Sequence, residues 1–353
     1  LKLVYWRAKM IGFKCQCGQA LYFESTWCEA CGSMVGFDPS SLTFKTLEDE
    51  EAVSQYQLCS NGANHGICNW VTKGKEIGSL CFACKFNRFI PNLSNPRNLW
   101  RWGELEKAKK RLFFTLLRQG VPLIDGWQLK KNGLLFDFLE DQRSNDYALE
   151  PFVSTGHANG VITINILEAE PVARAAEQMA HQEKHRSLLG HLRHESGHYF
   201  WYLMRDNEFL TNRFEKLFDS PNIDYDLALE SYYVKGAQAA WWERYITPYA
   251  SSHPFEDWAE TWSHYLHLID GLETAQHLGF TGEDFSSEPL RHKLKIWEEI
   301  SSRLDELNRS LGVTDHYHFS VNELVAKKLE FVESFIQELQ TTGLMQGVGQ
   351  KLS

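Results

Sequence analysis

The sequence predicts an α+β protein, in which a small cysteine-rich domain precedes a larger, mainly helical domain with a small sheet. Three observations support this prediction. All eight cysteines fall within the first 84 residues. A His-Glu-Ser-Gly-His stretch covers residues 194–198, and a further segment rich in carboxylates and aromatics starts near residue 254. A chain of 353 residues is long enough for about two domains, each with its own core.

The bulk composition is that of an ordinary folded protein and argues against some classes of partner. Hydrophobic residues make up 43% and charged residues 23%. The net charge of -10 argues against nucleic acid as the main partner, because phosphate binding needs a basic surface. No apolar run approaches the roughly 20 residues that span a bilayer, and the N-terminus lacks the apolar core of a secretory signal. We therefore expect a cytoplasmic protein without a membrane partner, with Met10 as a candidate natural start.

The cysteines form closely spaced groups that predict two structural zinc sites. Such clusters are typical of thiolate metal sites in a reducing compartment rather than of disulfides. A segment with so little core needs stabilising cross-links, and four thiolates around Zn²⁺ supply one. The simplest pairing joins Cys15, Cys17, Cys28 and Cys31 on one ion and Cys59, Cys68, Cys81 and Cys84 on the other. An interleaved pairing stays open, and His65 is a spare ligand candidate that fits an ordinary loop residue better. We assign residues 10–95 to this domain.

Residues 98–340 are expected to form the second domain and residues 341–353 a flexible tail. Apolar spacing predicts helices over 99–120, 168–203, 290–307 and 321–339, with 269–275 as a connector. Strands are expected at 136–139, 152–155 and 160–166. If 160–166 lies at the sheet edge beside the histidine motif, it could pair with a substrate backbone, although a purely structural role fits equally well.

The histidine motif predicts a metal site. On a helix, His194 and His198 lie one turn apart on one face, where two neutral imidazoles can hold Zn²⁺. Glu195 is then placed beside the open coordination position, as the general base of a metal-dependent peptidase. The alternative is a chance match on a surface helix, with a probability on the order of a few per cent, and the apolar flanks argue against it. His191 could support this site or contact substrate, although a local structural role is more common for such a histidine.

A later helix offers a third ligand, which a catalytic zinc with two histidines needs. Pro254 fits the first turn of this helix, with Ser252 or His253 as its cap. Burying several ionisable groups on one helix face is costly unless they meet a metal or one another. A solvated polar stripe is the weaker alternative, because large aromatics flank the groups in question: Glu256, Glu260, His264 and His267. The acidic and aromatic residues 205–245 in between are more typical of core or interface, with a cleft wall as the alternative.

These segments together resemble a bacterial family of zinc-binding metallopeptidases that carry an N-terminal zinc-ribbon domain. The matching parts are the cysteine-rich segment and residues 155–165, 190–199, 253–261 and 307–312, so the resemblance covers nearly the whole chain after Met10. It implies a double zinc ribbon followed by a mainly helical, zincin-like metallopeptidase domain with a small sheet. It also implies zinc as the cofactor, with one catalytic and two structural ions.

A shorter resemblance concerns the third ligand. Residues 249–262 are similar to a segment of the anthrax lethal factor catalytic domain that reads tyrosine, six residues, glutamate, three residues, glutamate. This similarity implies that Glu256 binds the metal and that the Tyr249 phenol stabilises the oxyanion. Glu260 would orient a zinc histidine. Glu260 as the ligand stays open.

The expected function is zinc-dependent hydrolysis of a peptide or protein substrate. The alternative is a non-enzymatic adaptor that binds a protein partner through the zinc ribbon and uses the peptidase-like domain as a scaffold. Nucleic-acid binding through the ribbon ranks last, because the ribbon has few basic residues and carries the acidic run Glu48–Glu51.

Overall fold

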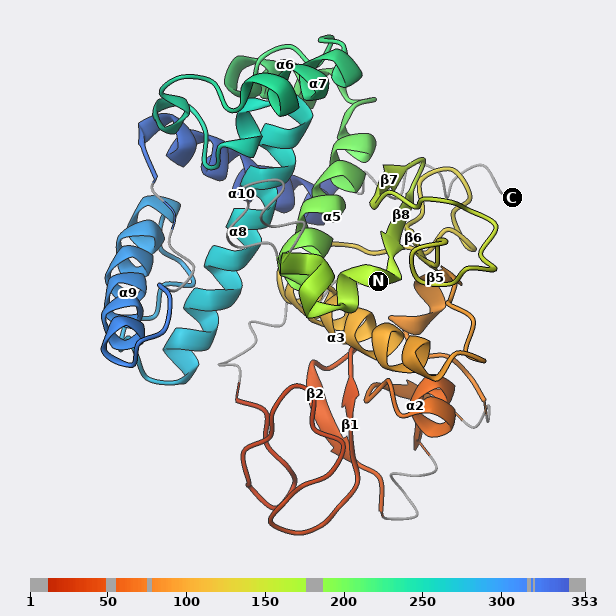
Figure 1. Ribbon diagram of the computed structural model, residues 1–353. Coiled ribbons are helices and arrows are strands. Elements are labelled where there is room, and N and C mark those ends of the chain that lie inside the picture. The colour runs from red at the N-terminus through yellow and green to blue at the C-terminus, as the bar shows by residue number, and fades with distance from the viewer. Residues whose placement is uncertain are drawn as a thin grey trace. The chain divides into compact units, whose positions relative to one another are not determined.

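The computed structural model describes residues 12–48, 55–74, 78–175, 187–315, 319 and 321–342, and Figure 1 shows the ribbon. The predicted α+β class is confirmed: two four-cysteine groups stand in the N-terminal part, and most of the remaining elements are helices. The internal contacts of the chain define two compact units, described in turn below. No helix among the described residues is long and apolar enough to cross a membrane.

The first unit comprises residues 1–59, 69–79 and 267–318. It contains two short antiparallel hairpins and the helix α9 (Leu290–Ser310), together with the last part of α8 (Pro254–His277). The hairpins pair β1 (Val35–Asp38) with β2 (Thr43–Thr46) and β3 (Tyr56–Leu58) with β4 (Val71–Lys73). Strands this short bury little, so aromatic rings fill the core between them, with centroids 5.1–6.5 Å apart: Phe13, Phe23, Phe37, Phe44 and Trp70.

The second unit comprises residues 60–68, 80–266 and 319–353, and a four-stranded mixed sheet lies within it. The strand order is β5 (Asn87–Phe89), β6 (Leu135–Leu139), β8 (Val161–Asn165) and β7 (Gly156–Ala158). Strands β5, β6 and β8 are parallel, and β7 is antiparallel to β8. The aromatic and β-branched side chains of the two central strands are almost fully buried, which explains why these segments form the sheet: Phe136, Phe138, Ile162 and Ile164.

Two of the three predicted strands are confirmed, and the strand predicted at 152–155 is wrong. The backbone there is held by side chains instead of a neighbouring strand. The Val153 N–H donates to Asp141 Oδ2 at 3.0 Å, and the Val153 carbonyl accepts from Asn165 Nδ2 at 2.9 Å. The short strand β7 follows this segment. It forms the sheet edge, and β8 lies between β6 and β7, so of the two roles left open for 160–166 the position of β8 favours the structural one.

Several helices belong to the second unit. They are α2 (Ser60–His65), α3 (Pro96–Arg118), α5 (Leu188–Met204), α6 (Glu208–Phe218), α7 (Tyr225–Lys235), α8 (Pro254–His277) up to residue 266, and α10 (Glu323–Thr342). Short 3₁₀ turns add η1 (Cys84–Phe86), η2 (Ile166–Ala169), η3 (Trp241–Glu243) and η4 (Tyr249–Ser251). The start of α3 follows from its sequence, because the Asn95 side chain accepts from Arg97 N and Pro96 fits the first turn.

The single helix predicted over 168–203 is wrong. Residues 166–169 form η2, and Glu170 is extended, as the residue before Pro171 prefers. The helix with the histidine motif begins at Leu188, where the Ser187 hydroxyl caps it by accepting from Gly190 N at 3.0 Å.

The predicted connector at 269–275 is also wrong, because α8 continues to His277. A Cβ on Gly271 would lie 2.5 Å from the Trp297 ring on α9 (Leu290–Ser310), so this glycine allows close packing and does not break the helix. Of the predicted tail, Thr341 and Thr342 close α10, and residues 343–353 lie outside the described part of the chain.

Helices α5 and α8 pack against each other at a glycine, and this contact builds the site (Figure 1). A Cβ on Gly197 would lie 2.8 Å from the Ala259 Cα, so only glycine permits this approach. Two indole N–H groups of α8 then hold α5: Trp258 donates to the Gly197 carbonyl at 2.8 Å, and Trp262 to the Ser196 hydroxyl at 2.9 Å. The residues between the motif histidines therefore fix the distance to α8.

Candidate metal centre

The eight thiols lie in two groups of four, which match the simplest predicted pairing: Cys15, Cys17, Cys28 and Cys31, and Cys59, Cys68, Cys81 and Cys84. The Sγ atoms of Cys15 and Cys31 are 3.7 Å apart, those of Cys17 and Cys28 are 3.6 Å apart, and those of Cys68 and Cys81 are 3.6 Å apart. A tetrahedron with Zn–S bonds of 2.3 Å has edges of about 3.8 Å, whereas a disulfide needs about 2.05 Å. The thiols thus have the spacing of zinc ligands.

A third group joins α5 and α8. The Nε2 atoms of His194 and His198 are 3.1 Å apart, Glu256 Oε2 lies 3.0 Å from His194 Nε2, and Glu256 Oε1 lies 3.4 Å from His198 Nε2. Four-coordinate Zn²⁺ with bonds of about 2.0–2.1 Å separates its ligand atoms by about 3.3 Å. The measured separations between these side-chain atoms are therefore close to those in a four-coordinate zinc site.

Contacts beyond the ligands favour a cation at this point. His194 Nδ1 lies 2.7 Å from Glu260 Oε1, and since a carboxylate only accepts, the Nδ1–H donates and Nε2 faces the ligand cluster. Thr247 in turn donates to Glu260 Oε2 at 2.8 Å. Burial alone would lower the pKa of His194, but the hydrogen-bonded carboxylates of Glu256 and Glu260 raise it well above its usual value. The two carboxylates thus favour positive charge here, which a metal ion can supply.

Glu195 is buried beside this group, as the motif predicts. One of its oxygens, Oε1, lies 3.2 Å from His191 Nε2, while Oε2 is buried and has no hydrogen-bond partner among the described residues. Burial would raise the pKa of Glu195, but the hydrogen bond from His191 and the nearby histidines lower it to about 2. The result is an ionised carboxylate with one oxygen available to accept a proton. Such an unpartnered buried oxygen is expected of a general base next to a metal-activated water.

Two tyrosines lie near the ligands. The Tyr249 ring, on η4, has its centroid 6.0 Å from that of His194. Tyr225, the first residue of α7, donates a hydrogen bond from its hydroxyl to Glu256 Oε1 at 2.6 Å. Tyr225 was not among the predicted site residues, because residues 205–245 are more typical of core or interface. A tyrosine between two aspartates, Asp224 and Asp226, could not be told from other aromatics in that segment.

The remaining candidate histidines serve other contacts. His253 Nδ1 accepts from Phe255 N at 3.0 Å, so His253 and not Ser252 caps the start of α8. His264 Nδ1 donates to the Glu260 backbone carbonyl at 2.7 Å, and the His65 ring lies beside Trp102. None of these, nor His267, belongs to the metal-ligand groups of the described residues.

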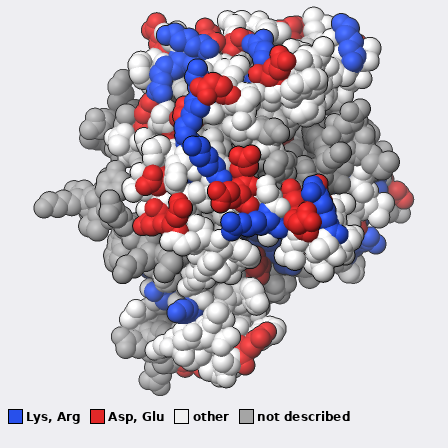
Figure 2. Space-filling view, turned by 90° about the vertical axis from the view of Figure 1, so that its left-hand side faces the viewer, with Lys and Arg blue, Asp and Glu red and all other residues white. Residues whose placement is uncertain are grey.

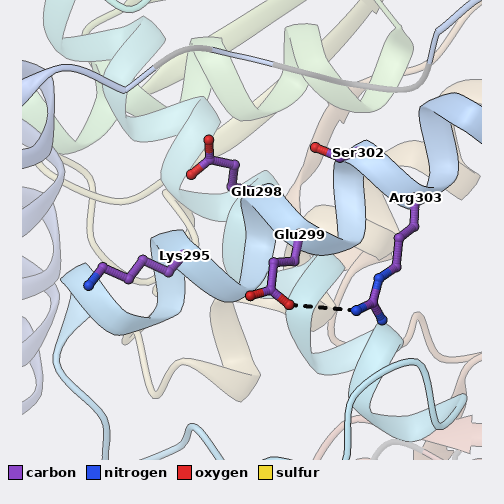
Figure 3. A pocket seen from close by; sticks show the side chains of 5 residues that line it. All are labelled: Lys295, Glu298, Glu299, Ser302 and Arg303. Carbon is purple, nitrogen blue, oxygen red and sulfur yellow. Dashed lines mark ion pairs between the residues drawn. The ribbon is translucent and has the colours of Figure 1, made fainter.

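A surface hollow of different chemistry lies on α9, in the first unit. Figure 3 shows a shallow hollow lined only by side chains of α9: Lys295, Glu298, Glu299, Ser302 and Arg303. Glu299 and Arg303 form an ion pair there at 3.7 Å. On the face in Figure 2, acidic and basic side chains are interleaved, so this face offers no uniform basic strip.

The fold and these groups define a class: a protein with two four-cysteine groups and a helical domain that carries a His-His-Glu group with the geometry of a metal site. Residues 98–335 match the model of a family described as "putative zinc-binding metallo-peptidase", and residues 12–95 match a zinc-ribbon domain. The chain belongs to this metallo-peptidase family.

Similar proteins come from mycobacteria. Uncharacterized proteins of Mycobacterium tuberculosis strain H37Rv and of Mycobacterium bovis are each 34% identical to this chain over 339 residues. These matches cover 94% of this chain and 96% of each relative. No solved structure matches the chain.

Proposed function

We propose that the protein is a zinc-dependent peptidase, with Zn²⁺ held by His194, His198 and Glu256. One observation supports this most directly: nitrogen and oxygen atoms of these three residues stand 3.0–3.4 Å apart, next to a buried Glu195 oxygen that has no hydrogen-bond partner among the described residues. A merely structural zinc site would be closed by a fourth protein ligand. In the group formed by the described residues there are three.

In this proposal Zn²⁺ held by His194, His198 and Glu256 would supply Lewis-acid chemistry, which polarises a carbonyl and lowers the pKa of water. Glu195 Oε2 takes the proton of that water and later passes it to the leaving amine. The Tyr249 phenol donates a hydrogen bond to the carbonyl oxygen as negative charge develops. Glu260, through its hydrogen bond to His194 Nδ1, keeps Nε2 directed at the ligand group.

Zinc stoichiometry and activity together test this proposal. Native mass spectrometry should count three zinc ions on the wild type and two on the His194→Ala/His198→Ala variant. Glu195→Ala should keep three ions but lose cleavage of a quenched-fluorescent casein or peptide library by about 10²–10⁴-fold or more.

Two outcomes would count against the peptidase proposal. Unchanged cleavage by Glu195→Ala would remove the general base from the mechanism. Two ions on both wild type and double histidine variant, even with added zinc, would favour the adaptor function in which the ribbon binds a protein partner.

A further inference from the structure

The two oxygens of the Glu256 carboxylate have different surroundings. Oε1 accepts the Tyr225 hydroxyl hydrogen bond at 2.6 Å. Oε2 lies 3.0 Å from His194 Nε2 and takes no hydrogen bond from any other described group. Glu256 is only 1% exposed, so solvent water does not supply Oε2 with the hydrogen bond that Oε1 has from Tyr225. Each oxygen therefore lies near one histidine, since Oε1 is also 3.4 Å from His198 Nε2, but only Oε1 is held by a hydroxyl donor.

A carboxylate ligand can bind a metal through one oxygen or both, and its outer hydrogen bonds decide which oxygen is presented. We propose that Tyr225 is the positioning residue of the third ligand, and that its hydroxyl holds Oε1 so that Oε2 is the oxygen presented to the metal. This inference rests on the proposed metal site and adds to it a residue from a third helix. It also separates the roles of two phenols, with Tyr225 acting on the ligand and Tyr249 on the substrate.

The surroundings of Tyr225 suit a fixed anchor. Asp224 caps α7 by accepting from Leu227 N at 3.0 Å, which sets the first turn that carries Tyr225. The Tyr225 ring packs edge-on against His253, with centroids 5.0 Å apart, and His253 Nε2 donates to the Ile223 carbonyl at 3.1 Å. The segment is therefore tied both to the start of α8 and to its own helix cap.

A similar hydrogen bond from outside the ligand group holds His194 on α5. Glu260 on α8 holds His194 on α5, and Tyr225 on α7 holds Glu256 on α8. Each contact costs one hydrogen bond when it is broken, and outer partners of this kind typically contribute 10–100-fold to metal affinity. None of the residues of α7 is buried, so loss of one hydroxyl there leaves no cavity in the core.

Zinc affinity of the full-length protein tests the assignment. Occupancy of the third zinc ion would be followed by native mass spectrometry over a series of buffered free zinc concentrations. Tyr225→Phe should move half-occupancy to about 10–100-fold higher free zinc and leave the two cysteine-bound ions in place. Tyr233→Phe, which removes a phenol from the same helix, should leave the half-point where it is in the wild type.

Further variants separate the hydrogen bond from its surroundings. Tyr249→Phe should lower kcat without moving the zinc half-point. Asp224→Ala removes the α7 cap but keeps the hydroxyl, and should shift the half-point less than Tyr225→Phe does.

The inference is overturned if Tyr225→Phe binds the third zinc ion with the wild-type half-point. It is also overturned if Tyr249→Phe moves that half-point, or if Asp224→Ala shifts it as far as Tyr225→Phe does. A wild type that takes up no third ion would defeat the proposed function itself, which is a different result.

Discussion

At the scale of single residues, the site alternates carboxylates and imidazoles. Glu168 Oε2 lies 2.5 Å from His191 Nδ1, and the opposite nitrogen of that ring lies 3.2 Å from Glu195 Oε1. Thr155 donates to the other oxygen of Glu168. Because each group limits the rotation of the next, His191 can hold the Glu195 carboxylate in the position that the chemistry requires.

His191→Asn is therefore expected to lower kcat/KM by about 10–100-fold while the protein keeps three zinc ions. The physical reason is loss of orientation of Glu195, since none of the three proposed metal ligands is altered. Cleavage assays and native mass spectrometry measure the two quantities. His292→Asn, which changes an exposed histidine paired with Glu283, is the matched control and should leave both unchanged. Wild-type kcat/KM in His191→Asn would show that Glu195 is held without it.

At the scale of elements, the approach of α5 to α8 determines whether the ligands meet. Ser196 and Gly197, between the two motif histidines, receive the indole hydrogen bonds of Trp262 and Trp258. Glu256, the proposed third ligand, comes from the same stretch of α8 as these indoles. The residues of the HExxH motif therefore include both the helix contact and the proposed ligands.

Gly197→Ala should destabilise the protein, because its Cβ would come within 2.8 Å of the Ala259 Cα and 3.3 Å of the Trp262 Cβ. Overpacking of this kind costs about 1–3 kcal/mol in the free energy of unfolding. Urea denaturation followed by tryptophan fluorescence measures it. Gly156→Ala is the control, since no heavy atom lies within 4 Å of its added Cβ. Equal stability of both variants would mean that the helices can separate without cost.

A contact in the site could be predicted from the sequence only where helical spacing or short-range cysteine spacing brings the residues together. His194, His198 and Glu195 could be placed together because helical spacing fixes them, and the thiol groups because short-range cysteine pairs do. The Tyr225–Glu256 and Glu168–His191 contacts join residues 31 and 23 positions apart, and helical or strand periodicity does not predict contacts at such separations. The errors at 152–155 and 168–170 have a similar origin: side chains of Asp141 and Asn165, and a proline at 171, overrode the apolar pattern.

At the scale of the whole molecule, the two thiol groups differ in their exposure to solvent. Cys17 and Cys31 of the first group are exposed, whereas all four members of the second group are buried. Reagents in solution can therefore reach two thiols of the first group directly.

The thiol-bound zinc ions should therefore be lost in a fixed order. With iodoacetamide, Cys17 and Cys31 should be alkylated first, and native mass spectrometry should record loss of one zinc ion in the same interval. Cys59, Cys68, Cys81 and Cys84 should react only later, because the reagent reaches them only when the surrounding structure opens. The chain in denaturant with a chelator is the control, and there all eight thiols should react at similar rates. Early alkylation of Cys68 or Cys81 in the folded protein would contradict the order, since it would mean that the second group opens as readily as the first.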